Sequence, residues 1–150
     1  MKKIVTILLM CLMSFGAFAE GWYYTNNRAM MLSDPLFLDG DPDNPTYLAL
    51  AIDGNFGKDM ILMGLQGDGL TNFREKQLYV VVSFDFGKDE RWRIIELNDD
   101  DPKFKYFSIV SADKFINRLR SCNSLQVTLP VYQNGTQTFY FNCNGYPLDW

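Results

Sequence analysis

The stretch of sequence that decides the fold is LQVTLPVYQNGTQTFYFNC, residues 125–143. Apolar and polar residues alternate on both sides of Asn134-Gly135, which is the pattern of two half-buried strands joined by a tight turn. A two-residue loop at Asn134-Gly135 would set apolar positions against polar ones. We therefore predict a three-residue loop of Gln133, Asn134 and Gly135, in which the glycine is left-handed.

The predicted register of this hairpin contains three apolar pairs: Leu129 with Phe139, Val127 with Phe141, and Leu125 with Cys143. Pro130 has no amide hydrogen to donate to a neighbouring strand. Residues 125–132 are therefore predicted to be an edge strand or to carry a bulge.

Other segments have the composition of strands, namely residues 22–24, 29–32, 46–53, 58–65, 78–86, 91–97 and 106–110. Residues 46–53 and 58–65 lack alternation, which indicates burial on both faces of a hairpin. Residues 78–86 place Phe84 and Phe86 on one apolar face and are predicted to form a central strand. The run of Asp, Asn and Pro over residues 39–45 predicts a surface loop.

The sequence predicts one helix, over residues 112–120. Ser111 stands at the N-cap position, and Phe115, Ile116 and Leu119 form one apolar stripe at helical spacing. About eight short strands with one helix predict a mainly β fold, a single-domain antiparallel β-sandwich or small barrel.

The first 19 residues have the charged start, apolar run and Ala17-Phe18-Ala19 exit of a secretory signal peptide. We expect cleavage after Ala19, a periplasmic location, and one domain over residues 20–150 with no membrane span. A lipoprotein site at Cys11 is the less favoured alternative, because Met10 precedes it where a small residue is expected. The chain has 18 acidic and 14 basic residues, which disfavours nucleic acid as a partner.

Cys122 and Cys143 are the two cysteines beyond the signal segment. Exported chains meet an oxidising compartment, so a disulfide between them is predicted, with two buried free thiols as the alternative. Because Cys122 lies three residues before Leu125, the bond requires the chain to bend at residues 121–124.

Histidine is absent, which excludes a Ser-His-Asp site and any histidine-ligated metal. The carboxylates of Asp39, Asp41 and Asp43 have the spacing that opens a calcium loop, but Asn44 replaces the required glycine and Leu50 the required glutamate. We expect a solvated loop there, and no catalytic residue, metal or cofactor. An acidic pair of the kind that glycosidases use stays open as a minor alternative.

Trp22, Tyr23 and Tyr24 are the candidate binding residues, because three consecutive aromatic rings offer much contact area to a sugar or a protein side chain. The alternative is that Trp22 belongs to the core and the two tyrosines are ordinary edge-strand residues.

The layout of the chain resembles small exported bacterial β proteins of the type VI secretion accessory (VasI-like) family and, more distantly, of the invasion-associated locus B family. The matching features are Trp22, Met30-Met31, residues 79–85 before Trp92, residues 115–119 before Leu125, and residues 138–141 with Gly145 and Leu148. The resemblance implies a β-sandwich with a non-enzymatic exported role and brings no catalytic residues.

Two classes of function follow from these observations. The favoured one is a periplasmic protein-binding protein, tied to a secretion system or acting as an immunity protein against a toxin. The alternative is a carboxylate-dependent hydrolase acting on cell-wall glycan.

The signal-peptide prediction has a direct test. Protein purified from periplasm should begin at Glu20, and its intact mass measures this. A mass matching all 150 residues contradicts export by cleavage.

Overall fold

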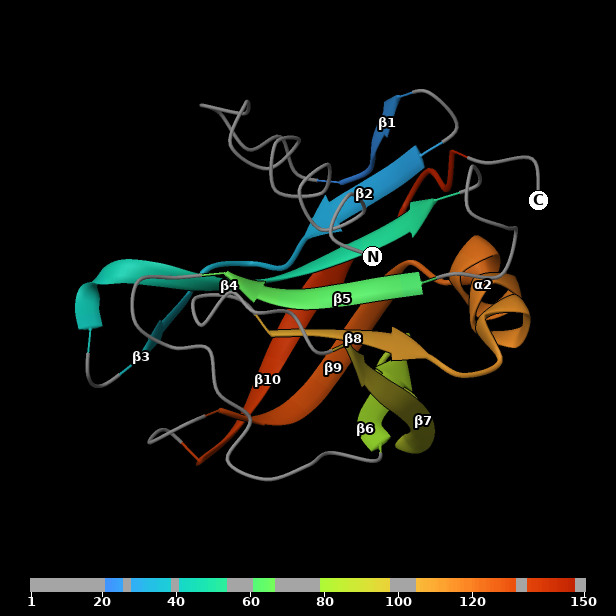
Figure 1. The fold of residues 1–150 in the computed structure, drawn as a ribbon. Coiled ribbons are helices and arrows are strands. Elements are labelled where there is room, and N and C mark those ends of the chain that lie inside the picture. The colour runs from blue at the N-terminus through green and yellow to red at the C-terminus, as the bar shows by residue number, and fades with distance from the viewer. Residues whose placement is uncertain are drawn as a thin grey trace.

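The computed structural model describes residues 21–25, 28–38, 41–53, 61–66, 79–97, 105–131 and 135–147. The fold is mainly β. Within these ranges ten strands form one antiparallel sheet that curls into a half-barrel, and helix α2 lies at one end of it (Figure 1). The mainly β, antiparallel class predicted from the sequence is confirmed.

The strands follow in chain order: β1 (Tyr23–Thr25), β2 (Arg28–Leu32), β3 (Leu36–Leu38), β4 (Asp41–Asp53), β5 (Ile61–Gln66), β6 (Tyr79–Phe84), β7 (Glu90–Leu97), β8 (Lys105–Ile109), β9 (Ser124–Val131) and β10 (Gly135–Asn142). In the sheet the order is β1-β2-β4-β5-β8-β7-β6-β9-β10, and β3 pairs with β4 beside this path. The sequence did not predict β3.

The hairpin of β9 and β10 forms, but its register differs from the predicted one by two residues. Phe139 pairs with Val127 and Phe141 with Leu125. A shift of two keeps every side chain on its own face, so apolar residues still oppose apolar ones. Gly135 is left-handed as predicted, with φ 67, but it begins β10 instead of closing the loop.

The edge-strand prediction for residues 125–132 is wrong, because β9 pairs with β6 as well as with β10. The pairing with β6 covers Leu125 to Thr128 and ends before Pro130, so β6 requires no amide hydrogen from this proline. The central position predicted for residues 78–86 is confirmed, since β6 lies between β7 and β9.

Strand β7 changes partner along its length. Its first half, through Arg93, pairs with β6, and its second half, from Ile94, pairs with β8. A strand that passes from one set of neighbours to another turns the corner of a curled sheet. The link between β2 and β3 also reaches β10, because the Asp34 amide donates a hydrogen bond to the Tyr140 carbonyl at 2.7 Å.

The predicted loop over residues 39–45 is wrong in its second part, since β4 begins at Asp41. Among the described residues the first part of β4 pairs with β3, with a register irregularity between Leu36 and Leu38. A two-stranded ribbon with a bulge tolerates Pro42 and Pro45, which a central strand would not. Burial on both faces is confirmed further along β4, where Leu48 to Ile52 are at most 4% exposed.

Helix α2 (Ala112–Ser121) confirms the predicted helix within one residue. Ser111 is its N-cap, but φ is 61 and its hydroxyl makes no capping hydrogen bond. Phe115, Ile116 and Leu119 are buried in the core. The ring of Phe115 packs edge-on against those of Phe84 and Trp92, with centroids 5.3 and 4.9 Å away.

Replacing Phe115 with alanine should lower the free energy of unfolding by about 3–5 kcal/mol, because it removes a fully buried ring and leaves a cavity. Urea unfolding measures the change. Lys114→Ala, on the exposed side of the same helix, is the control and should change it by less than about 0.5 kcal/mol. Equal midpoints for the two variants would show that α2 is not docked through Phe115.

Candidate binding surface

The turn between β6 and β7 is the most strained backbone in the part of the chain that the structure describes. Asp85 and Phe86 both have positive φ, at 51 and 56. The Gly87 amide donates to the Phe84 carbonyl at 2.9 Å, closing the turn around them. Left-handed backbone is rare for a bulky residue such as Phe and costs about 1–2 kcal/mol.

Hydrogen bonds from β9 hold this turn in place. The Asp85 carboxylate accepts hydrogen bonds from the amides of Asn123 and Ser124 at 2.7 and 3.0 Å. The Asp85 amide in turn donates to the Ser124 carbonyl at 2.9 Å. The surrounding structure thus fixes the strained conformation. Strained backbone persists at functional sites only where its surroundings hold it in this way.

The residue after Phe86, Gly87, is also suited to this turn. A side chain on Gly87 would place its Cβ 3.0 Å from the Phe84 carbonyl oxygen, a tight contact, so the close return of the chain favours glycine. The Ser83 hydroxyl donates to the Gly87 carbonyl at 2.9 Å and supports the same return.

The turn presents the ring of Phe86 to solvent. Phe86 is 71% exposed, the largest fraction among the large hydrophobic side chains that the structure describes. The sequence pattern put Phe86 on the apolar face with Phe84, but β6 ends at Phe84 and only Phe84 is buried. A rigid, exposed aromatic ring is the kind of anchor that proteins use to bind one another.

A charged contact lies beside the turn. Arg118 of α2 forms an ion pair with Glu90 at 2.8 Å, and its guanidinium lies 4.4 Å from the centroid of the Phe84 ring. These contacts join the helix to the first residue of β7. The turn, the helix end and the start of β9 therefore form one rigid end of the molecule.

The predicted disulfide is wrong for this structure, because Cys122 and Cys143 are free, buried thiols. The predicted bend does occur, since α2 ends at Ser121 and β9 begins at Ser124. The shifted register sets Cys143 against Asn123, whose carbonyl accepts the Cys143 amide hydrogen at 2.9 Å. The Cys122 thiol instead donates to the Leu119 carbonyl at 3.6 Å.

The two thiols still contact each other. Their shared hydrogen bond lowers the pKa of Cys122, and the same bond together with burial raises the pKa of Cys143 far above its ordinary 9.0. The first proton of such a dithiol leaves more readily than that of a lone thiol, and the second is held more strongly.

The three predicted binding aromatics do not share one face. Trp22 packs against the core, donates its indole N–H to the Cys143 carbonyl at 3.0 Å, and meets the Tyr146 ring edge-on with centroids 5.5 Å apart. Tyr23 and Tyr24 are 42% and 51% exposed and follow one another in β1, so they point to opposite faces. Binding through the two tyrosines remains a prediction.

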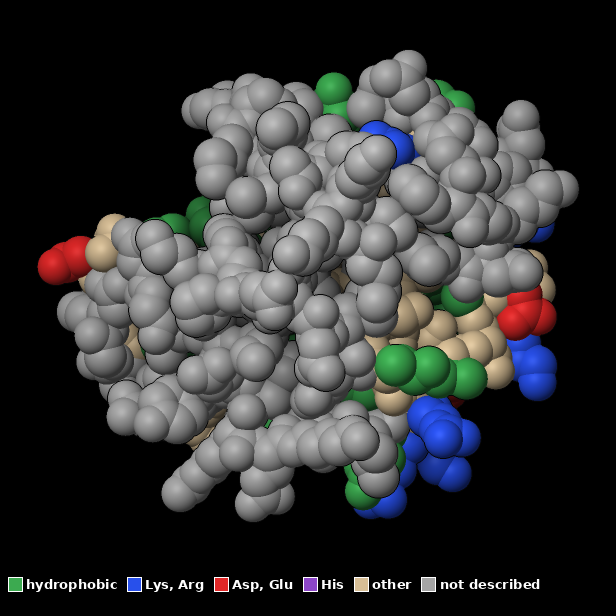
Figure 2. Space-filling model, viewed as in Figure 1, with side chains coloured by type: hydrophobic (Ala, Val, Ile, Leu, Met, Phe, Trp, Pro, Cys, Tyr) green, Lys and Arg blue, Asp and Glu red, His purple; other side chains and the backbone are tan. Residues whose placement is uncertain are grey.

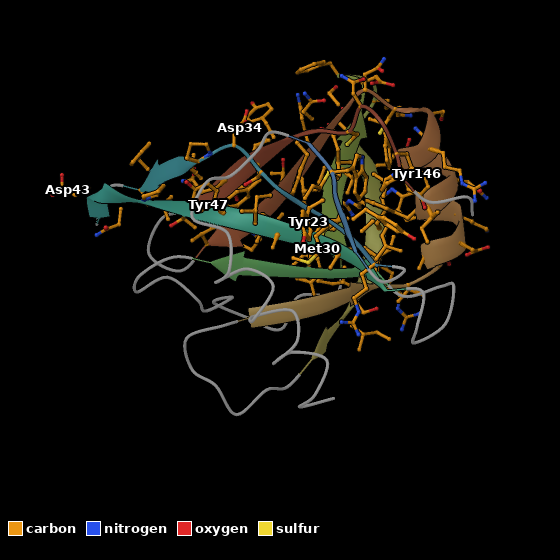
Figure 3. The ribbon with its side chains drawn as sticks, turned by 90° about the horizontal axis from the view of Figure 1, so that it is seen from above. Tyr23, Met30, Asp34, Asp43, Tyr47 and Tyr146 are labelled. Atoms are coloured by element: carbon orange, nitrogen blue, oxygen red, sulfur yellow. The ribbon has the colours of Figure 1, made fainter. Side chains whose placement is uncertain are left out.

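The carboxylates do not gather into a metal site within the described ranges, where no group of three His, Cys, Asp or Glu side chains comes together. Figure 3 places Asp43 at the far tip of the β3–β4 hairpin, away from Tyr23 and Tyr146. Asp39 lies outside the described residues. Among the described residues no helix is long and apolar enough to cross a membrane.

Comparisons with protein-family models, with curated proteins and with solved structures found no match to this chain. The resemblance to VasI-like proteins therefore stays a prediction.

Replacing Phe86 with glycine should raise the free energy of unfolding by about 1 kcal/mol, because glycine adopts positive φ without strain and the exposed ring has little packing to lose. Urea unfolding measures it. Phe37→Gly, at an exposed position of β3 without positive φ, is the control and should be destabilising. A destabilised Phe86→Gly variant would mean that the ring supports the fold.

The thiol pair predicts a loss of stability in alkali for the reduced protein. Above pH 9 the unfolded chain has released both thiol protons while the folded chain keeps that of Cys143, so the free energy of unfolding falls by up to about 1.4 kcal/mol per pH unit. Burial also raises the pKa of Tyr146, which acts in the same direction. Cys143→Ala should remove the thiol part of the slope in urea unfolding between pH 9 and 11; an unchanged slope contradicts this assignment.

Proposed function

We propose that this protein is an exported, periplasmic protein-binding protein without catalytic activity, and that the turn carrying Phe86 is its principal contact. The observation that carries the proposal is an aromatic ring 71% exposed on a left-handed residue. Both properties oppose stability, since the strain costs free energy and the exposed ring gains none by burial. Their joint presence on a well-fixed turn is accounted for by a partner that buries the ring.

The physics of association favours such an anchor. A side chain on fixed backbone loses little conformational freedom when it binds, so more of its burial energy appears as affinity. The Asp85 hydrogen bonds to Asn123 and Ser124 supply this fixation before any partner arrives. Fully burying a Phe side chain contributes about 1.5–3 kcal/mol, which is the range of a binding hot spot.

The broader role comes from the resemblance stated above. A secretion-system accessory protein and an immunity protein both act by binding another protein tightly, and neither requires catalytic side chains. Both therefore fit a surface built around an aromatic anchor.

The test is capture of a partner from periplasmic extract by the immobilised protein. We expect one partner in stoichiometric amount, lost with Phe86→Ser and kept with Phe37→Ser, which removes another exposed ring, from β3. Equal capture by both variants would exclude Phe86 as the contact. Absence of any partner, with hydrolysis of purified peptidoglycan by the protein, would favour the alternative function as a carboxylate-dependent hydrolase.

A further inference from the structure

A second surface of this chain combines arginine with exposed apolar side chains. Four outward residues of β6 and β7 form it, and we call it the arginine face: Tyr79, Arg91, Arg93 and Ile95. All four are exposed, Tyr79 by 45% and Ile95 by 58%. Figure 2 shows Lys and Arg side chains gathered beside exposed hydrophobic ones at the corner where Figure 1 draws β6 and β7.

Strand pairing sets the arrangement of these side chains. Arg93 stands directly opposite Tyr79 in the ladder. Arg91 lies on the diagonal, and its guanidinium stacks 4.9 Å from the centroid of the Tyr79 ring. Stacking orients the planar guanidinium in advance and so lowers the ordering cost of a bidentate contact.

Among the described residues, no acidic side chain forms an ion pair with Arg91 or Arg93. By contrast, Arg118 of α2 pairs with Glu90. The whole chain carries a net charge of −4. Arg91 and Arg93, to which the described part of the chain supplies no ion partner, therefore stand out from an acidic molecule, and charge complementarity favours an acidic ligand.

We propose that the arginine face binds an extended acidic segment of the partner protein, with carboxylates on alternate residues. This inference rests on the proposed protein-binding function and adds the chemistry of the partner. Arg91 and Arg93 are two residues apart on one strand, which separates them by about 7 Å, and alternate side chains of an extended partner have the same spacing. Each guanidinium matches one carboxylate in a bidentate pair.

The apolar members of the face favour a protein over other polyanions. Tyr and Arg are enriched in protein interfaces, and Ile95 offers a partner exposed apolar area. Nucleic acids and anionic membranes are bound through the neutralisation of many phosphates, which two arginines on an acidic chain do not supply. The experiment tests both of them as competing ligands.

The experiment measures binding of labelled synthetic peptides by fluorescence anisotropy at low salt. The probe alternates Glu with Thr. One control peptide has the same number of Glu residues at every third position, and another has Gln in place of Glu. We expect the alternating peptide to bind best and the double variant Arg91→Glu/Arg93→Glu to weaken it by about tenfold or more.

The matched protein control is Lys114→Glu, the same change of charge at an exposed position of α2. It should change the affinity by less than about twofold. Equal binding of the alternating and every-third peptides overturns the spacing argument. Loss of affinity with Lys114→Glu as large as with the double variant, or stronger binding of phosphatidylglycerol vesicles or single-stranded DNA, overturns the arginine face as a protein site.

Failure of this inference is distinguishable from failure of the proposed function. If the arginine variants capture the periplasmic partner as well as the wild type does, while Phe86→Ser loses it, the acidic contact is excluded and the protein-binding function stands. If neither the wild type nor any variant captures a partner, the proposed protein-binding function itself is excluded. Loss of capture with both Phe86→Ser and the double arginine variant supports one interface that uses both surfaces.

Discussion

The structure depends on the pairing of β6 with β9, which joins segments that are far apart in the chain. Val81 pairs with Thr128 and Phe84 with Leu125, so the middle of the sequence lies against its C-terminal hairpin. This contact places Val82 and Val127, both fully buried, side by side in the core. A contact of such sequence separation closes a long loop, and that entropy must be recovered by burial. The apolar inner face of β6, β9 and β10 supplies the burial.

The same pairing supports the strained turn. Because β6 meets the very start of β9, the first residue after β6 lies beside the amides of Asn123 and Ser124. The carboxylate of Asp85 satisfies both amides at the point where α2 has ended and β9 has just begun. The turn is thus held by a long-range contact and not by its own sequence preference. This accounts for a left-handed Phe, which an isolated hairpin of this sequence would avoid.

Whether a feature of the fold or of the site was predictable depends on how far apart in the chain the interacting residues lie. The alternation of residues 125–143, the stripe of α2 and the buried run of β4 are local patterns, and each predicted its element correctly. The exact register of β9 and β10 and the exposure of Phe86 were not predictable, because a shift of two leaves the alternation unchanged and the turn depends on β9. A signal for the turn was present in Asp85-Phe86-Gly87, but the alternation through Phe84 and Phe86 outweighed it. The disulfide prediction failed for a different reason, since it rested on the oxidising compartment and on the count of cysteines, and neither of these fixes how the two thiols are placed.

The two candidate binding features lie on the hairpin of β6 and β7, Phe86 in its turn and the arginines on its second strand, and they have different structural support. Phe86 depends on hydrogen bonds to β9, whereas Arg91 and Arg93 depend on the ladder between β6 and β7. The partner of β7 changes from β6 to β8 at Ile94, so the ladder with β6 runs through Arg93. The arginine pair therefore occupies the last straight stretch before the corner of the sheet. An extended ligand lying along β7 from the turn would meet Phe86 first and the two guanidinium groups next. The direction of β7 would therefore set the order of the apolar and the charged contact along a single partner.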